Sequence, residues 1–398
     1  MNVLLFKRDG VNHNSLNFFA DEIANQLKRH GVRVFYLSLL DNDRIAGELV
    51  DILANQKIDA AIMLNAFGQQ DFSYNGEKNL WDAFGIQFYN YIVDSPIEHG
   101  NNLDSECENY HVICIDKKHK SFIEANYPRI KSVHFLPVAG SGDLSALQDD
   151  ICKFSSRKMN IALTAGLVDP ESILKSVDVY PEDIRSLALD IVDYMKVHLD
   201  KSPEESIDDV LISRFTDSIK ENRDLYIRLV QIMSFAPFYI RTWIRKKVVE
   251  SIIKSGIELH IYGEGWDYLL SEYPSNNVFL HGDVDISQTP LLYRDVKLAL
   301  NIMPMFKLGS HDRIATAQIN GAAVLTDENE YLYDFYKGTD GVLFYSFNEV
   351  DTLPDRVLDI VSDEKRLYKI AINGQRIAKQ KLTWEALGEK LYEILLKQ

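Results

Sequence analysis

The chain has 398 residues, of which 46% are hydrophobic and 26% are charged, a composition typical of folded globular proteins. Its net charge of −16 argues against nucleic acid as a partner, because a phosphate backbone attracts basic surfaces. The length predicts two domains, or three. The three cysteines form no CxxC pair and no disulfide framework, which suits a reducing compartment.

Nothing in the sequence predicts export or a membrane span. The N-terminal segment MNVLLFKRDG lacks the pattern of a signal peptide, because its apolar run is short and its charges follow that run. A spanning helix needs about 20 mostly apolar residues. The best candidate, residues 229–240, contains Gln231, Ser234 and Pro237. We therefore expect a soluble, cytoplasmic protein.

The first 150 residues alternate short apolar runs with helical patterns. The runs are rich in β-branched and aromatic residues, which predicts strands. Repeated strand–helix–strand units with apolar strands predict a parallel sheet covered by helices on both faces. We assign residues 1–150 to one Rossmann-like domain. Its expected strands are residues 2–6, 32–39, 59–64, 87–93, 110–115 and 133–138.

The middle of the chain has a different pattern. Residues 167–224 hold 15 acidic and 7 basic residues, about half of the net negative charge of the chain. Their apolar residues follow helical spacing, as at Ile184, Leu187 and Ile191. We assign residues 151–250 to a helical insertion or linker whose acidic faces are solvated.

A basic, aromatic helix is predicted at residues 226–254. It carries Arg241, Arg245, Lys246 and Lys247 close together. A basic helix of this kind suits contact with an anionic membrane surface. Peripheral contact at the inner face of the membrane through these four residues therefore stays open, beside the alternative of an ordinary packing helix.

The last part of the chain returns to alternating strands and helices. We assign residues 251–380 to a second Rossmann-like domain and residues 381–398 to a C-terminal helix. The expected fold class is α/β, with two Rossmann-like domains facing each other across a cleft and the acidic helical insertion between them. The expected strands of the second domain are residues 257–262, 278–280, 298–302, 323–325 and 341–345.

The loops at the carboxyl ends of the strands are informative, because open parallel sheets bind ligands there. The loop after the first strand, KRDGVNHNS, lacks the GxGxxG fingerprint of dinucleotide-binding proteins. A nicotinamide-dependent oxidoreductase is therefore an unfavoured alternative.

The segment KLGSHDR, residues 307–313, predicts an anion-binding site. It follows a strand and opens a helix, whose N-terminus is expected at Gly309 and Ser310. Free backbone N–H groups and the helix dipole attract anions there. Asp312 is expected to cap the helix or to orient Arg313. The side chains that add hydrogen-bond donors are those of Lys307, His311 and Arg313.

Two further motifs in the second domain are less specific. The GEGW segment, residues 263–266, follows a strand, and its glycines allow a close approach of the backbone to a ligand. A tight turn between strand and helix explains the same pattern. Asp283 and Asp285 form a DxD pair, which holds a divalent metal in some nucleotide-sugar enzymes. Two surface aspartates in a turn are common, and we expect no metal here.

Several blocks of the sequence resemble GT-B glycosyltransferases, especially the bacterial group related to the CgeB spore-maturation protein. The C-terminal blocks are RKKVVESIIKSGIELHIYGEGW, NNVFLHGDV and LNIMPMFKLGSHDRIATAQINGAAVLTDENEYL. The N-terminal blocks are YIVDSPIEHG, VICIDKKHKSFIEANYP and VHFLPVAG. The resemblance covers most of both predicted Rossmann-like domains but not the acidic middle.

The resemblance implies a glycosyltransferase that takes a nucleotide-diphosphate sugar, with a UDP-sugar favoured, and needs neither a cofactor nor a metal. The implied acceptor is a surface glycan, a lipid-linked intermediate or a protein side chain. Residues 309–313 would hold the diphosphate. Thr316 stands where many members carry a Glu that binds the ribose hydroxyls. The other residues implied at the donor pocket are Gly263, Glu264, Gly265, Trp266, Gly282, Thr326 and Asp327.

Transfer of the sugar requires stabilisation of negative charge on the departing diphosphate, which suits Arg313. If the enzyme inverts configuration, a base must also take the proton of the acceptor hydroxyl. Asp94 and His99 in the first domain are the candidates for this role, and His13 and Asp71 are weaker choices. For His99, a satisfied surface histidine is the alternative.

Two further function classes stay open. A nucleotide-sugar epimerase of related fold would share the anion site and would need no acceptor. A non-catalytic two-domain protein would bind the nucleotide-sugar without turnover.

Overall fold

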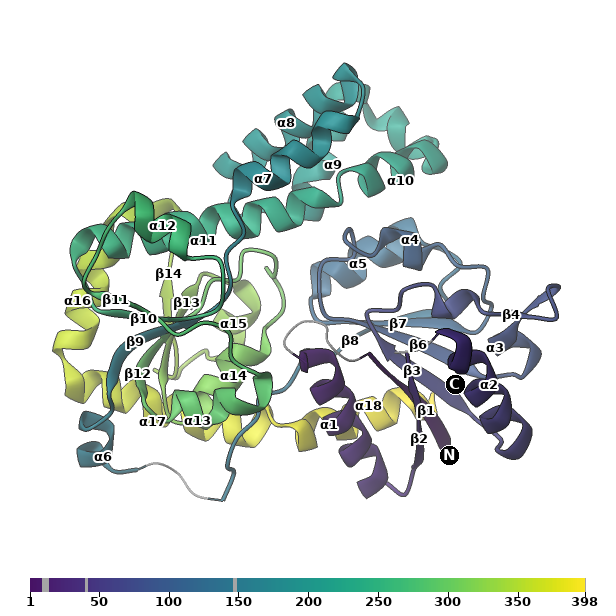
Figure 1. Cartoon of the computed structure of the whole chain (residues 1–398), viewed down its shortest axis with the longest axis horizontal. Helices are drawn as coiled ribbons and strands as arrows, with labels where there is room; N and C mark the ends of the chain where they lie inside the picture. The colour runs from purple at the N-terminus through teal and green to yellow at the C-terminus, as the bar shows by residue number, and fades with distance from the viewer. Residues whose placement is uncertain (9–13, 40–41, 146–148, 398) are drawn as a thin grey trace. The chain divides into compact units, whose positions relative to one another are not determined.

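The structure is a computed structural model that describes residues 1–8, 14–39, 42–145 and 149–397. It divides into two compact units. Unit 1 comprises residues 1–138, 285–287 and 384–398, and unit 2 comprises residues 139–284 and 288–383. Within the described residues, each unit contains one six-stranded parallel sheet flanked by helices (Figure 1). The predicted α/β class with two parallel-sheet domains is confirmed.

The sheet of unit 1 has all its neighbouring strands parallel. Its strands are β1 (Asn2–Lys7), β2 (Arg33–Ser38), β3 (Ala60–Leu64), β6 (Gln87–Ile92), β7 (Tyr110–Cys114) and β8 (Ser132–Phe135), in the order β2-β1-β3-β6-β7-β8. Each of the six lies within a few residues of a strand expected from the sequence. β3, near the centre, is buried at every position, as expected for a parallel strand covered on both faces.

The helices of unit 1 come from both ends of the chain. They are α1 (Ser15–Arg29), α2 (Asn42–Asn55), α3 (Leu80–Ala83), α4 (Gly100–Leu103), α5 (Lys117–Asn126) and α18 (Trp384–Leu396), with a small hairpin of β4 (Ser73–Tyr74) and β5 (Lys78–Asn79). α18 packs on α1, where the rings of Phe19 and Trp384 lie 5.5 Å apart. The C-terminal helix expected from the sequence therefore belongs to the first domain.

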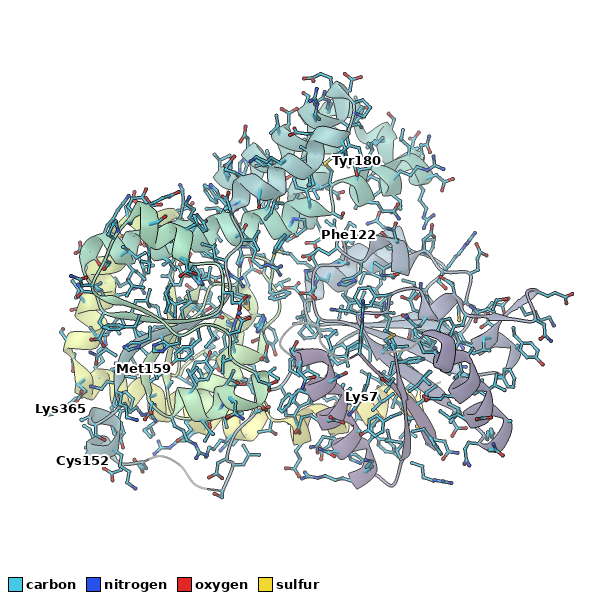
Figure 2. The ribbon with its side chains drawn as sticks, viewed as in Figure 1. Lys7, Phe122, Cys152, Met159, Tyr180 and Lys365 are labelled. Carbon is cyan, nitrogen blue, oxygen red and sulfur yellow. The ribbon has the colours of Figure 1, made fainter. Side chains whose placement is uncertain are left out.

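The sheet of unit 2 is also parallel throughout. Its strands are β9 (Met159–Thr164), β10 (Leu259–Tyr262), β11 (Val278–Leu280), β12 (Val296–Leu300), β13 (Ala323–Asp327) and β14 (Leu343–Tyr345), in the order β11-β10-β9-β12-β13-β14. Met159, at the start of β9, lies within this unit in Figure 2, whereas Cys152 and Lys365 lie at its surface.

β9 corrects the predicted domain boundaries. We assigned residues 151–250 to the helical insertion and began the second domain at residue 251, but β9 pairs with β10 on one side and β12 on the other. Ala162 of β9 is paired with His260 of β10 on one side and with Ala299 of β12 on the other. A short apolar run is compatible with a strand or a buried helix. Only pairing with partners about a hundred residues later in the chain made this run a strand.

The acidic middle of the chain is helical, as predicted, and no strand occurs among its described residues 167–224. Its helices are α7 (Pro170–Leu174), α8 (Glu182–Val197) and α9 (Pro203–Phe215), with 3-10 helices η3 (Lys175–Val179) and η4 (Asp217–Glu221). The predicted basic helix is in fact two helices, α10 (Arg223–Ile232) and α11 (Phe235–Ser255). α7 and α8 pack on α11, which links them to the helices covering the sheet (Figure 1).

The core of unit 2 lies between its sheet and three helices. Ile244, Val248 and Ile252 on α11 pack with the strands and with α16 and α17. The helices of this unit not yet given are α6 (Ile151–Ser155), α12 (Asp267–Glu272), α13 (Thr289–Tyr293), α14 (Asp312–Ile319), α15 (Glu330–Phe335), α16 (Leu353–Ser362), α17 (Glu364–Lys381) and the 3-10 helix η6 (Phe347–Thr352). None of the helices in the described ranges is both long enough and apolar enough to cross a membrane.

Candidate functional site

The side chains predicted to bind a ligand in the second domain follow strands that end at one edge of its sheet. β9, β10, β12 and β13 end at Thr164, Tyr262, Leu300 and Asp327. Because these strands are parallel, their carboxyl ends meet at the edge where open α/β sheets bind ligands. α14 begins in the loop that follows β12.

The last residue of β9 and the segment after β9 bind two arginines from distant parts of the chain. Arg313, on α14, donates from Nη1 to the carbonyl oxygen of Thr164 at 3.1 Å and from Nε to Oδ1 of Asn301 at 3.3 Å. Arg245, on α11, donates from Nη1 to the carbonyl oxygen of Gly166 at 3.0 Å. Both side chains are half-buried. These bonds orient two guanidinium groups at the carboxyl edge of the sheet.

Arg241, Arg245 and Arg313 form a cluster of like charges, which we call the arginine cluster. Burial and the charges of Arg313 and Arg241 hold the pKa of Arg245 well below its usual range. Burial and Arg241 also lower the pKa of Arg313, against the opposing charge of Asp312. The positive charges of these guanidinium groups repel one another. A phosphate-type anion would offset the repulsion and accept their hydrogen bonds.

Asp327, the last residue of β13, is a buried carboxyl group near the arginine cluster. Its Oδ1 accepts a hydrogen bond from the backbone N–H of Met303 at 2.6 Å. Its Oδ2 has no hydrogen-bond partner among the described residues, and the side chain is 0% exposed. Burial raises the pKa of Asp327 to about 6, although Lys307 and Arg313 act in the opposite direction. Asp327 therefore changes charge close to neutral pH.

Asn301 connects β12 to the arginine cluster. Its Oδ1 accepts from Arg313, and its Nδ2 donates to Oγ1 of Thr326 at 2.9 Å. Its carbonyl oxygen accepts from the hydroxyl of Tyr345 at 3.1 Å. Asn301 and Thr326 are both buried. Thr326, predicted at the donor pocket, thus acts through Asn301 to position Arg313.

The start of α14 corrects the predicted helix. His311 is the N-cap and Asp312 is the first helical residue, so Gly309 and Ser310 lie in the preceding loop and Asp312 is not the cap. Nδ1 of His311 lies 2.6 Å from Oδ1 of Asp312. Burial and the charge of Arg313 lower the pKa of His311, while Asp312 acts in the opposite direction. Gly, Ser and Asp all favour helix starts, so local sequence could not distinguish these positions.

Other contacts hold the loop before α14 in place. Lys307 is 8% exposed, and its Nζ donates to the carbonyl oxygen of Leu199 at 2.6 Å. Asn329 donates from Nδ2 to the carbonyl oxygen of Gly309 at 3.1 Å. Ser310 is buried. Of the side chains predicted as donors, Arg313 donates to the carbonyl oxygen at the end of β9, whereas Lys307 donates to that of Leu199.

The GEGW segment, predicted to line the donor pocket, packs against protein backbone. A Cβ on Gly263 would lie 2.4 Å from the carbonyl oxygen of Ala165. At Gly265, with φ +86°, it would lie 1.9 Å from that of Leu167. Trp266 is 1% exposed and donates from Nε1 to the carbonyl oxygen of Ala165 at 2.7 Å. The glycines are required by the approach of two chain segments, and Trp266 belongs to the core.

The turn after β11 is tied to the same segment. The carbonyl oxygen of Gly282 accepts from the backbone N–H of Gly263 at 2.7 Å. Oδ1 of Asp283 accepts from the backbone N–H of Glu264 at 3.0 Å, while the side chain of Glu264 is exposed. Asp283 therefore has a structural role in this turn.

Thr316 packs against the segment that opens unit 2. Its Oγ1 accepts from the backbone N–H of Ser141 at 3.2 Å, and its side chain is buried. A Cβ on Gly140 would lie 2.5 Å from the backbone nitrogen of Thr316. The hydroxyl expected near a ribose is thus engaged inside the protein.

In unit 1, Asp94 and His99 lie together after β6. Nε2 of His99 is 3.9 Å from Oδ2 of Asp94, and Asn65 donates from Nδ2 to the same oxygen at 2.8 Å. Phe67 packs against the His99 ring with centroids 6.0 Å apart. His99 is 8% exposed. The structure brings the two predicted catalytic residues of this domain together and adds Asn65, which sequence analysis did not single out.

The weaker candidates do not join this group. His13 lies outside the described residues. Oδ1 of Asp71 accepts from Oγ of Ser105 at 2.5 Å, and its Oδ2 accepts from Gln70 at 2.9 Å, which indicates a structural role.

In the described ranges, no group of three or more His, Cys, Asp or Glu residues is placed to hold a metal ion. Oδ1 of Asp285 accepts from the backbone N–H of Ser287 at 2.9 Å.

Sequence analysis missed Arg241 and Arg245 as site residues. It assigned the basic residues of α11 to a membrane-facing or packing surface. Two of them instead belong to the arginine cluster, while Lys247 lies over the ring of Trp243 at 4.4 Å. The available signal was their spacing of four residues, which places both arginines on one face of a helix.

Comparison with known proteins agrees with this description. A family model described as glycosyl transferase-like matches residues 241–393. No curated protein sequence matches the chain.

Solved glycosyltransferase structures share the fold along the whole chain. Sucrose-phosphate synthase from Thermosynechococcus elongatus superposes with a TM-score of 0.59 at 10% identity, covering 100% of this chain and 98% of that one. The Anabaena protein HepE in complex with UDP-glucose has a TM-score of 0.53 at 12% identity, with 100% of both chains covered. A glycosyltransferase from Rickettsia africae has a TM-score of 0.56 at 10% identity, covering 100% and 98%. The two parallel-sheet domains therefore match the GT-B glycosyltransferase fold.

Proposed function

We propose that this protein is a glycosyltransferase that binds a nucleotide-diphosphate sugar in unit 2 and transfers the sugar to an acceptor hydroxyl. The observation that carries the proposal is the arginine cluster at the carboxyl edge of the second sheet. The family match over residues 241–393 supports the same activity. We expect UDP as the nucleotide, and the shared fold with HepE, whose structure contains UDP-glucose, supports this choice.

The arginine cluster would stabilise the leaving group. During transfer, the bond between the sugar carbon and the diphosphate oxygen breaks, and the electron pair leaves with the diphosphate. Negative charge then grows on the phosphate oxygens, and preorganised cations lower the barrier by stabilising it. Arg313 and Arg245 are held by carbonyl oxygens before any ligand binds, so little reorganisation is needed.

Unit 1 would supply the base. As the acceptor oxygen forms its bond to the sugar carbon, its proton must leave, and Nε2 of His99 is the proposed acceptor of that proton. The carboxylate of Asp94 would stabilise the imidazolium that results. Asn65 donates to that carboxylate and so holds it beside His99. The cytoplasmic location and the metal independence expected from the sequence stay predictions, and so does the membrane contact that the sequence leaves open.

A thermal-shift screen tests the donor site. Wild-type protein is heated with UDP-, GDP-, TDP-, ADP- and CMP-sugars, with and without a divalent metal ion. A ligand that binds only the folded state raises the melting temperature by mass action. We expect a shift with UDP-sugars that is lost in Arg313→Ala. No shift with any nucleotide-sugar, alone or with acceptor sugars present, would contradict the proposal.

Turnover assays separate the alternatives. Release of UDP that depends on an acceptor supports a transferase. Conversion of the donor to an isomer without an acceptor supports an epimerase. Tight binding without transfer, isomerisation or hydrolysis over a broad acceptor panel supports a binding protein.

A further inference from the structure

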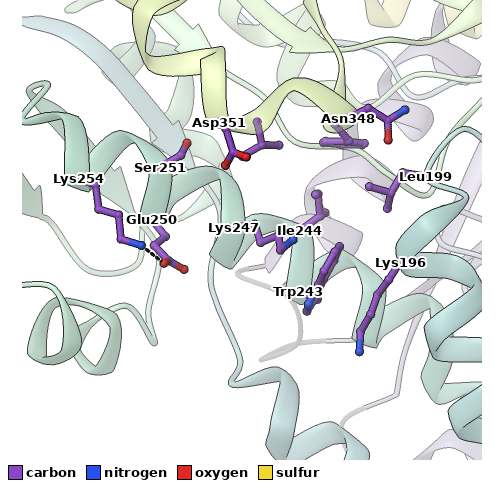
Figure 3. Close-up of a pocket in the computed structure, with 12 residues that line it drawn as sticks. Lys196, Leu199, Trp243, Ile244, Lys247, Glu250, Ser251, Lys254, Asn348 and Asp351 are labelled. Carbon is purple, nitrogen blue, oxygen red and sulfur yellow. Dashed lines mark hydrogen bonds and ion pairs between the residues drawn. The ribbon is translucent and has the colours of Figure 1, made fainter.

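Unit 2 also contains a pocket that shares no residue with the arginine cluster. It has a volume of about 320 Å³ and is lined by α11, η6 and residues at the end of α8 (Figure 3). Small-molecule sites usually occupy about 300–1,000 Å³. The pocket therefore suits a ligand of one ring rather than a whole nucleotide-sugar.

Three lysines and two carboxylates line the pocket. Lys196, Lys247 and Lys254 line it, in a chain whose net charge is −16. Lys254 pairs with Glu250, and Lys196 lies 3.3 Å from a carboxylate oxygen of Asp193. No carboxylate of the described residues lies within ion-pair distance of Lys247. An anionic group entering the pocket would meet this ammonium group without displacing a salt bridge.

The same wall presents an aromatic ring. Trp243 is half-buried, with Nζ of Lys247 at 4.4 Å and Nζ of Lys196 at 6.0 Å from its ring. Figure 3 shows both lysines beside the Trp243 side chain. An indole ring offers a large apolar face on which the C–H face of a sugar ring packs. The ammonium group of Lys247 lies over this ring, so a sugar that packs on the indole must share the face with Lys247 or displace it.

Polar side chains complete the lining. Ser251 donates its hydroxyl proton to the carbonyl oxygen of Val248, so its oxygen can only accept from a ligand, whereas the side-chain amide of Asn348 can both donate and accept. The carboxylate of Asp351 adds an acceptor for hydroxyl groups. An aromatic platform with these groups around it matches the chemistry of a saccharide better than that of a bare inorganic anion.

Two residues of the pocket wall also contact Lys307. The carbonyl oxygen of Leu199 accepts from Nζ of Lys307 at 2.6 Å, and the ring of Phe347 lies 5.7 Å from the same nitrogen. Lys307 in turn acts electrostatically on Asp327. The pocket is therefore separated from the carboxyl edge of the sheet by one side chain.

We propose that this pocket binds an anionic monosaccharide, with its ring on Trp243 and its negative group between Lys196 and Lys247. A sugar phosphate and a hexuronate both have the required chemistry. The proposal concerns binding alone and does not rest on the proposed transferase activity.

Tryptophan fluorescence tests the proposal directly. Of the four tryptophans, Trp81, Trp266 and Trp384 are 0%, 1% and 5% exposed, so Trp243 is the one that a ligand in the pocket would touch. Full-length protein is titrated with glucose 6-phosphate and with galacturonate. We expect a saturable change with at least one of them. Absence of saturation with both would overturn the proposal.

Matched variants locate the binding. Lys247→Gln should weaken the affinity at least tenfold, equivalent to about 1.4 kcal/mol. Lys158→Gln removes an exposed lysine elsewhere in unit 2 and should leave affinity unchanged. Equal affinity in wild type and Lys247→Gln would place the ligand elsewhere and contradict the proposal.

Two controls define the ligand class. Neutral glucose and inorganic phosphate should each bind at least tenfold more weakly than the anionic sugar. Equal binding of phosphate would reveal an anion site without a saccharide platform and would overturn the proposal. Trp243→Phe keeps a ring, so calorimetry should still detect the anionic sugar while the fluorescence change disappears. Circular dichroism confirms that each variant is folded.

Discussion

Arg245 and Arg313 donate hydrogen bonds to carbonyl oxygens that lie two residues apart in the chain, those of Gly166 and Thr164, at 3.0 and 3.1 Å. β9 ends at Thr164, so the exit of one strand holds guanidinium groups from α11 and α14. The pKa of Arg245 is lowered mainly by burial and next by the positive charge of Arg313, because the two guanidinium groups repel each other. The backbone thus maintains a charge cluster that a bound anion would neutralise.

Loss of one cluster arginine should abolish anion binding without unfolding the protein. In Arg313→Ala the hydrogen bonds to Thr164 and Asn301 are lost, but repulsion with Arg241 and Arg245 is relieved as well. We therefore expect the stability of the ligand-free protein to change by no more than about 1 kcal/mol. Differential scanning fluorimetry with pyrophosphate and UDP should show a shift in wild type and none in Arg313→Ala.

The control for this experiment is Arg366→Ala, which removes an exposed arginine that lies 3.7 Å from Asp359. It should retain the full shift. A shift in Arg313→Ala equal to that of wild type would remove Arg313 from the binding site.

Asp327 should make stability depend on pH. Its pKa is about 6 in the folded state against an ordinary value of 3.8, so the folded state binds more protons between these values. The contribution of Asp327 to the free energy of unfolding is therefore greatest below about pH 4. It falls by about 3 kcal/mol as the pH rises to about 6. Asp327→Asn stays neutral and should gain stability relative to wild type over that interval.

Urea unfolding of wild type and Asp327→Asn at pH 4, 5, 6 and 7 measures this difference. Asn keeps an oxygen that can accept from the Met303 N–H, so the fold should tolerate the change. Asp355→Asn, on the first turn of α16, serves as the control. A stability difference that does not vary with pH would contradict the assignment.

Gly265 should not tolerate a side chain. A Cβ there would lie 1.9 Å from the carbonyl oxygen of Leu167, and φ is +86°. Gly282 also has a positive φ, +68°, but its Cβ would meet nothing within 4 Å. Gly282→Ala should therefore cost about 1 kcal/mol, while Gly265→Ala should cost about 3 kcal/mol or more. Similar melting temperatures for the two variants would show that the segments of Leu167 and Gly265 separate easily.

His99→Gln should slow catalysis without weakening donor binding. General base catalysis contributes about 10²- to 10⁴-fold, so turnover should fall at least 100-fold. The thermal shift with UDP should be unchanged, because His99 lies in unit 1 and the arginine cluster in unit 2. Asp94→Asn should also reduce turnover, by a smaller factor, and should also leave the thermal shift with UDP unchanged. His30 is an exposed histidine of unit 1, and His30→Gln serves as the control. If His99→Gln and His30→Gln had equal turnover rates, His99 would not be the base.

The sequence by itself determined the fold class and pointed to one residue of the arginine cluster. Short β-branched runs alternating with helical patterns imply buried parallel strands, because only such strands are apolar on both faces, as β3 is. The segment KLGSHDR follows a strand, and a loop at that place in a parallel sheet lies at the ligand-binding edge. Arg313 was predicted from this local order alone.

Tertiary structure decided the features that depend on distant partners. β9 is a strand because β10 and β12 pair with it, and nothing local in residues 159–164 required this. Arg245 joins the arginine cluster through the carbonyl oxygen of Gly166, and Trp266 is held in the core through that of Ala165. Hydrophobic periodicity is encoded within a few residues. The groups that a charged or aromatic side chain meets are set by how segments far apart in the chain pack, and sequence spacing does not specify this.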